Sequence, residues 1–169
     1  MKPYALLFIV CVLTGGLFVF FASDDVQQQA PEAVSKLKPG TYKVEYDQPD
    51  FRGWKAFFVM EVNATGEMEE ITFDYINSSG GLKTQDVEYN KRMRSKSGVG
   101  PSDYCPRFVK NLRVYQNPDE VDGITGATHS SHDFKDFAQA AFKNAQIGNQ
   151  STVYIPQPEL VAPDAKEKK

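Results

Sequence analysis

Hydrophobic and polar residues alternate in the middle of the chain with the period of a strand. Alternation over residues 42–46 predicts a strand with one buried face. Residues 54–62 are apolar on both faces and predict a central strand. After turn residues at 63–66, residues 71–76 predict a third strand, so the three form an antiparallel meander.

Farther along the chain, the spacing of apolar residues becomes helical. The clearest run extends from Asp133 to Ala145 and predicts a helix with one apolar stripe. Gly148 follows, where a left-handed residue often ends a helix. Residues 84–96 predict a short charged helix, whose basic residues we interpret as a solvated face. Pro106 is predicted to open another helix at its first position. Tyr104 is predicted on a loop before it, either in the core or against a bound ring. These elements predict an α+β fold, a twisted antiparallel sheet packed against helices.

An apolar segment occupies the N-terminus. Within residues 1–22, the apolar run 4–22 would span roughly 28 Å as a helix, which matches a bilayer core of about 30 Å. Lys2 precedes this run and two aspartates follow it, so it is predicted to be a transmembrane signal anchor with the rest of the chain outside the cell. A cleaved signal peptide is the alternative, but a cut after residue 22 would leave the large Phe20 where a small residue is needed. Lipidation of Cys11 is not expected, because Val10 precedes it.

The remaining composition divides the chain into a linker, a domain and a tail. Residues 23–39 are polar and predict a stalk linker. Residues 40–155 form the predicted domain, with a last strand at 152–155. Residues 156–169 contain three prolines and a charged end, which predicts a disordered tail.

Charge and cysteine content narrow the possible functions. The formal net charge is −3, so no basic surface for nucleic acid is indicated. Cys105 is the only cysteine outside the apolar segment, so the domain has no internal disulfide and no Cys-x-x-Cys pair. Any redox chemistry in this domain therefore requires an organic cofactor.

The residues from Asp122 to Ser131 read Asp-Gly-Ile-Thr-Gly-Ala-Thr-His-Ser-Ser and lie directly before the predicted helix. The first N–H groups of a helix have no internal partner and attract anions, phosphate in particular. Gly123 and Gly126 allow positive φ or close approach of a ligand. Ser130 is predicted to cap the helix, with Asp133 three residues later. This junction predicts an anion site.

Residues 122–130 resemble the flavinylation motif of the FMN-binding domain family: Asp, two variable residues, Ser or Thr, Gly, Ala, Thr, any residue, Ser or Thr. That family includes the FMN-carrying subunits of sodium-pumping NADH:quinone reductases and Rnf-type complexes. The resemblance implies that FMN is joined through its phosphate to the hydroxyl of Thr128. It also implies that a Mg²⁺-dependent flavin transferase, with FAD as donor, reads the surrounding motif. The other predicted cofactor-binding residues are Asp122, Gly123, Thr125, Gly126, Ala127 and Ser130.

The function implied is that of a membrane-anchored extracytoplasmic electron carrier. Its electron donor would be a membrane quinone or NADH oxidoreductase. Two alternatives stay open: a cell-envelope module that binds FMN or another phosphate ligand without a covalent bond, and a flavin reductase. No constellation of general acid and base is evident, which favours a carrier over an enzyme. His129 and His132 are interpreted as surface residues.

Overall fold

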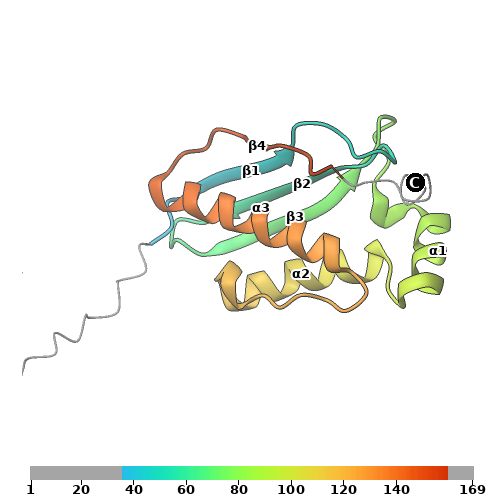
Figure 1. Cartoon of the computed structure of the whole chain (residues 1–169). Helices are drawn as coiled ribbons and strands as arrows, with labels where there is room; N and C mark the ends of the chain where they lie inside the picture. The colour runs from blue at the N-terminus through green and yellow to red at the C-terminus, as the bar shows by residue number, and fades with distance from the viewer. Residues whose placement is uncertain (1–35, 160–169) are drawn as a thin grey trace, which may run out of the picture. The chain divides into compact units, whose positions relative to one another are not determined.

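The computed structural model describes residues 36–159, which form one folded unit (Figure 1). Its elements are β1 (Gly40–Tyr46), β2 (Lys55–Val62), β3 (Met68–Ile76), the 3-10 turn η1 (Lys83–Gln85), α1 (Val87–Ser97), α2 (Pro101–Tyr115), the 3-10 turn η2 (Pro118–Glu120), α3 (Thr128–Ile147) and β4 (Val153–Ile155). The predicted signal anchor, most of the stalk and residues 160–169 lie outside the described residues. Within residues 36–159, no helix combines the length and hydrophobicity needed to cross a bilayer. The predicted α+β class is confirmed.

The four strands form one sheet in the order β3-β2-β1-β4. The predicted meander of β1, β2 and β3 is confirmed, and β2 is central. The prediction of a wholly antiparallel sheet is wrong, because β4 pairs with β1 in parallel, with Val44 opposite Val153. Parallel neighbours need a long connection, and here the whole helical half of the chain separates β1 from β4. Alternation along a strand reports its buried face and carries no information about the direction of its neighbour.

The core lies between the sheet and two helices, α2 and α3, which cover one of its faces (Figure 1). Phe134 of α3 packs edge-on against Phe58 of β2, with ring centroids 5.8 Å apart. Phe108 of α2 stacks on Phe134 at 4.8 Å. Tyr46, at the end of β1, meets Phe137 edge-on at 4.8 Å. These contacts hold α3 against β1 and β2.

Helix α3 carries the predicted apolar stripe. Its stripe residues are buried, apart from the half-buried Phe142: Phe134, Phe137, Ala138, Ala141 and Ala145. Gly148 ends the helix in the left-handed region, with φ 77°, as predicted. The helix begins at Thr128, five residues before the predicted Asp133.

The helices on the other side of the site differ from the prediction at their boundaries. Residues 83–85 form a separate turn, and α1 follows it at Val87. Pro106 does not open a helix; it lies inside α2, which begins at Pro101. The N–H of Gly100 donates to the Asp103 carboxylate at 2.8 Å. This bond caps the N-terminus of α2, about one turn before the predicted start at Pro106. Tyr104 is therefore a buried residue of α2 and does not lie on a loop.

Both ends of the described chain contact the domain. Leu37 is buried, and the Lys38 N–H donates to the Ala145 carbonyl at 2.9 Å. The Gln157 N–H donates to the Asp47 carboxylate at 2.9 Å. Folded structure thus extends past both ends of the sheet.

Truncation of Phe137 tests whether the stripe of α3 is the core of the whole domain. Phe137 is fully buried against Tyr46, so Phe137→Ala should lower the free energy of unfolding by about 3–5 kcal/mol. Lys135→Ala, an exposed position on the same helix, is the control. Urea denaturation of both variants measures the difference, and equal stabilities would show that α3 does not hold the sheet.

Candidate functional site

A tight turn positions the start of α3. The Ala127 N–H donates to the Ile124 carbonyl at 2.9 Å, so residues 124–127 form a β-turn with Gly126 third. Gly126 has φ 85°, as a type II turn requires at that place. A Cβ on Gly126 would lie 2.2 Å from the Ser97 carbonyl oxygen. Glycine is therefore needed here for both backbone conformation and space.

The turn is fastened to the core and to the first turn of the helix. Ile124 and Ala127 are buried. The Ser131 hydroxyl accepts from the Ile124 N–H at 3.1 Å and donates to the Ala127 carbonyl at 2.9 Å. Sequence reasoning assigned no role to Ser131, which is the hydroxyl that links the loop to α3.

Ser130 as N-cap and a positive φ at Gly123 are wrong predictions, whereas close approach of a ligand to Gly123 stays a prediction. Ser130 is not the N-cap, because α3 begins two residues before it and no side chain caps the helix. Ser130 is instead buried in the first turn. Gly123 does not have positive φ, and a Cβ there would meet only the Ser131 side chain at 3.5 Å. The backbone therefore does not require glycine at position 123.

The N-terminus of α3 presents free hydrogen-bond donors. Within residues 36–159, the N–H groups of Thr128, His129 and Ser130 donate no hydrogen bond. The helix dipole adds partial positive charge at the same place. Thr128 is exposed at the first helical position, so its hydroxyl lies beside these donors. This arrangement can bind a phosphate group.

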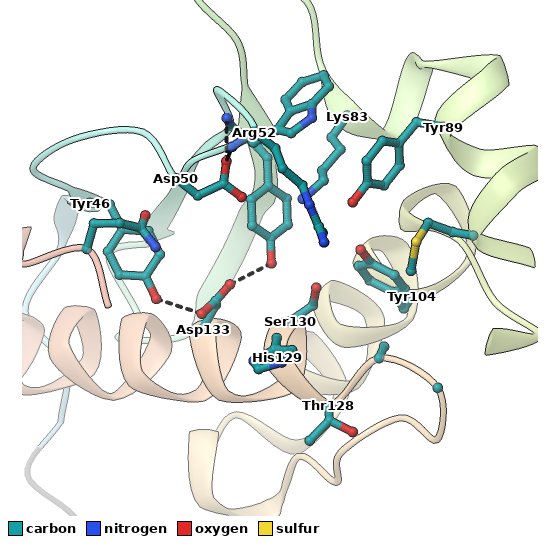
Figure 2. Close-up of a pocket in the computed structure, with 16 residues that line it drawn as sticks. Tyr46, Asp50, Arg52, Lys83, Tyr89, Tyr104, Thr128, His129, Ser130 and Asp133 are labelled. Atoms are coloured by element: carbon teal, nitrogen blue, oxygen red, sulfur yellow. Dashed lines mark hydrogen bonds between the residues drawn. The ribbon is translucent and has the colours of Figure 1, made fainter. Parts of the chain in front are cut away.

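A cleft opens beside this helix end, between the sheet and the helices (Figure 2). Five aromatic side chains contribute to its lining, four of them from β1, β3, α1 and α2 and one from the residue before β2: Tyr46, Tyr75, Tyr89, Tyr104 and Trp54. Charged side chains lie between them, among them Arg52, Lys83 and Asp133. The cleft therefore offers flat aromatic surfaces together with charges of both signs.

The structure divides the predicted cofactor-binding residues into two groups. Thr128, Gly126, Ala127 and Ser130 line the cleft. The other three, Asp122, Gly123 and Thr125, are exposed and do not line it. His129 and His132 are exposed, as predicted. His129 nevertheless lines the cleft mouth.

Asp133 joins the two sides of the cleft. Its carboxylate accepts from the Tyr46 hydroxyl at 2.6 Å and from the Tyr75 hydroxyl at 2.8 Å (Figure 2). Burial raises the pKa of Asp133, against the opposing effects of these two hydrogen bonds, Lys83 and His129. Burial also raises the pKa of Tyr46 and of Tyr75, so both phenols remain proton donors.

Lys83 brings a buried positive charge to the cleft. Only 6% of the residue is exposed. Its Nζ lies 3.9 Å from the ring centroid of Tyr75, 5.0 Å from that of Tyr89 and 5.7 Å from that of Trp54. No side chain in residues 36–159 forms an ion pair with this Nζ. Contact with aromatic faces offsets only part of the cost of burying an ammonium group.

Sequence reasoning found the helix end and missed most of the cleft. Tyr46 and Trp54 were assigned only as strand residues, and Tyr89 only as a helix residue facing the sheet. Tyr104 both packs in the core and lines the cleft. Lys83 lies in a turn after two glycines and carries no periodic signal. These residues are far apart in sequence, and they are brought together by the packing of α2 and η1 against β3 and of α1 against η1 and α2.

Comparison with known proteins agrees with this geometry. A sequence model of the FMN-binding domain matches residues 53–143. The "15 kDa lipoprotein" of Treponema pallidum (strain Nichols) is 33% identical over 119 residues, which cover 70% of this chain and 84% of that protein. The crystal structure of the CPE2226 protein from Clostridium perfringens matches with a TM-score of 0.67 and 35% identity, over 72% of this chain and 99% of that one. The chain belongs to the FMN-binding domain family, and its cofactor is FMN.

The residues present fit this cofactor. The free N–H groups at the start of α3 suit the phosphate, and the aromatic side chains of the cleft suit a flat conjugated ring. Lys83 supplies an unpaired ammonium group inside the same cleft. FMN carries the redox chemistry when bound, and these residues would hold and orient it.

The carboxyl group of Asp133 should make stability depend on pH. Its pKa in the folded protein is raised above the ordinary value of 3.8, so the folded state binds this proton more tightly than the unfolded state. The stabilising effect is complete below the ordinary pKa and is lost as pH rises through the raised value. Asp133→Asn cannot ionise, so the stability of the wild type relative to this variant should fall as pH rises from about 4 towards neutrality.

Urea denaturation across this pH range, on protein made without flavin, measures the effect. Asp136→Asn is the matched control, because Asp136 is exposed on the same helix. A stability difference between wild type and Asp133→Asn that does not change with pH would contradict the assignment.

Proposed function

We propose that this protein is a membrane-anchored extracytoplasmic electron carrier whose FMN is bonded through its phosphate to Thr128. One observation carries the proposal. Thr128 is exposed at the first position of α3, lines the cleft, and lies beside three free N–H groups. A phosphoester at this hydroxyl would keep its anionic oxygens within reach of those donors.

Attachment at Thr128 requires a separate enzyme. A threonine hydroxyl is a weak nucleophile unless a base or a metal activates it. Within residues 36–159, no cluster of three or more His, Cys, Asp or Glu side chains is placed to hold a metal ion. A Mg²⁺-dependent flavin transferase with FAD as donor would supply both. Asp122 and Thr125 are exposed next to the acceptor, so such an enzyme could read them directly.

The side chains of the cleft support a carrier over an enzyme. The Asp133 carboxylate is already engaged by two tyrosine hydroxyls. Cys105 does not line the cleft, and burial raises the pKa of its thiol, so this cysteine stays protonated and is a poor nucleophile. FMN accepts and releases one or two electrons, and the protein would fix its position and charge environment. Electrons would come from a membrane quinone or NADH oxidoreductase.

Membrane attachment is supported by sequence and by a relative. The Treponema pallidum relative is named a lipoprotein. In this chain we assign the same role to the apolar residues 1–22, which would tether the domain to the outer face of the cell membrane.

A non-covalent FMN-binding module is the second candidate. The observation in its favour is that Lys83 and the start of α3 could hold FMN without any covalent bond. Denaturation distinguishes the two candidates, because a phosphoester survives unfolding and a contact at a helix terminus does not.

The covalent proposal predicts the result of changing the acceptor threonine. When the full chain is co-expressed with a flavin transferase, acid-precipitated protein should stay yellow and gain the mass of FMN less water. Thr128→Ala should abolish both signals, because the acceptor hydroxyl is gone. Thr125→Ala is the matched control in the same loop. It should reduce the amount of bound flavin, and the flavin should remain attached to Thr128.

Two results would contradict parts of the proposal. If the wild type loses all flavin on denaturation, the linkage is not covalent and the second candidate is favoured. If Thr128→Ala retains the full mass gain, the acceptor residue is wrong.

A further inference from the structure

We propose that the ammonium group of Lys83 faces the ring of FMN and raises its reduction potential by stabilising the negatively charged reduced form. This inference rests on the proposed function for the position of the ring. It assigns a role to a residue outside the flavinylation motif, on a turn that precedes α1.

Lys83 is buried at an energetic cost. The residue is 6% exposed, and within residues 36–159 its Nζ has no ion-pair partner. The rings of Tyr75, Tyr89 and Trp54 surround the amine, at 3.9, 5.0 and 5.7 Å from their centroids. An ammonium group has three donors, and aromatic faces satisfy none of them fully. The side chain is therefore suited to a ligand that brings negative charge or acceptor oxygens.

Hydrogen bonds hold the backbone of Lys83 in place. The amide of the buried Asn90 donates to the carbonyls of Lys83 at 3.0 Å, Thr84 at 3.1 Å and Asp86 at 2.8 Å. Its carbonyl oxygen accepts from both the N–H and the hydroxyl of Ser102, each at 2.8 Å. Asn90 thus ties η1 to α1 and α2 and fixes the place from which Lys83 enters the cleft.

Lys83 and the start of α3 lie on different sides of the cleft. Figure 2 shows Lys83 pointing into the cleft from the side opposite Thr128. The phosphate already has donors at the start of α3, next to its acceptor hydroxyl. Aromatic side chains surround Lys83, and such surroundings match a flat conjugated ring better than a hydrated phosphate. The partner of Lys83 is therefore the ring.

The chemistry that follows is electrostatic. When the ring takes up two electrons from its donor and one proton from solvent, it gains one net negative charge. A positive charge close by, in a site partly closed to water, stabilises that form more than the neutral oxidised form. An ionised Asp133 destabilises the negatively charged reduced ring. Arg52, which also lines the cleft, stabilises it. Lys83 differs from Arg52 in being buried.

The experiment measures the two-electron midpoint potential of FMN in the full chain, reduced stepwise with dithionite in the presence of a reference dye. Lys83→Met removes the charge and keeps an apolar side chain among the aromatic rings. It should lower the preference for reduced over oxidised flavin at least tenfold, which equals about 30 mV for a two-electron couple. Lys83→Arg should stay near the wild type, because the charge is retained. Lys91→Met, an exposed lysine on α1, removes the same charge outside the cleft and should have little effect.

A second measurement on the same samples tests whether a change in potential comes from altered folding instead of the lost charge. In Lys83→Met, the pH at which reduced flavin gains its second proton should rise, because the negative form has lost its partner. If the Met variant does not fold, as judged by near-ultraviolet circular dichroism, Lys83→Gln replaces it, since glutamine keeps a polar group and lacks the charge.

The outcomes are distinct from those that test the covalent bond. A normal FMN mass gain with an unchanged potential in Lys83→Met would overturn the inference and leave the proposed function intact. Weaker FMN loading with an unchanged potential would overturn it too and would assign Lys83 to the phosphate. If wild-type protein carries FMN only non-covalently, the charge effect is measured as the ratio of dissociation constants for oxidised and reduced FMN. Equal ratios in wild type and Lys83→Met would then refute the inference.

Discussion

The close approach of Gly126 to the Ser97 carbonyl is the constraint on which the site depends. A side chain at position 126 would collide with that oxygen, so the turn can pack against the end of α1 only with glycine there. The turn buries Ile124 and Ala127 and starts α3 at Thr128. Because α3 is also the central core helix, the position of the acceptor hydroxyl is set by the packing of the whole domain.

The cleft combines two charges that the fold buries at a cost. Asp133 is held by tyrosines from β1 and β3. Lys83 is held by aromatic side chains from β3 and α1 and by Trp54, the residue before β2. Neither charge forms an ion pair within residues 36–159. Their burial destabilises the domain relative to an apolar cleft. A cofactor that carries charge and changes it on reduction gives both groups a function.

Sequence alone predicts the features that depend on local pattern. Alternation located β1, and the stripe from Phe134 to Ala145 located α3, because burial of one face leaves a periodic trace. The apolar residues on both faces of 54–62 located the central strand β2. The motif located Thr128 at a helix end. The helix starts predicted at Pro106 and Ser130 were wrong, because more than one nearby residue satisfies the same helix-start rule. Burial of Pro101 and of Ile124 in the folded domain decides where the two helices begin. The aromatic side chains and Lys83 have no local pattern, because their proximity arises from packing between distant segments.

Tandem mass spectrometry of the tryptic fragment from Val114 to Lys135, isolated from flavin-loaded full-length protein, would locate the residue that carries FMN. This fragment contains every hydroxyl of the flavinylation motif. The account predicts a mass increase of FMN less water, carried only by fragment ions that include Thr128. An unmodified fragment, or the same increase located on Thr125, Ser130 or Ser131, would contradict it.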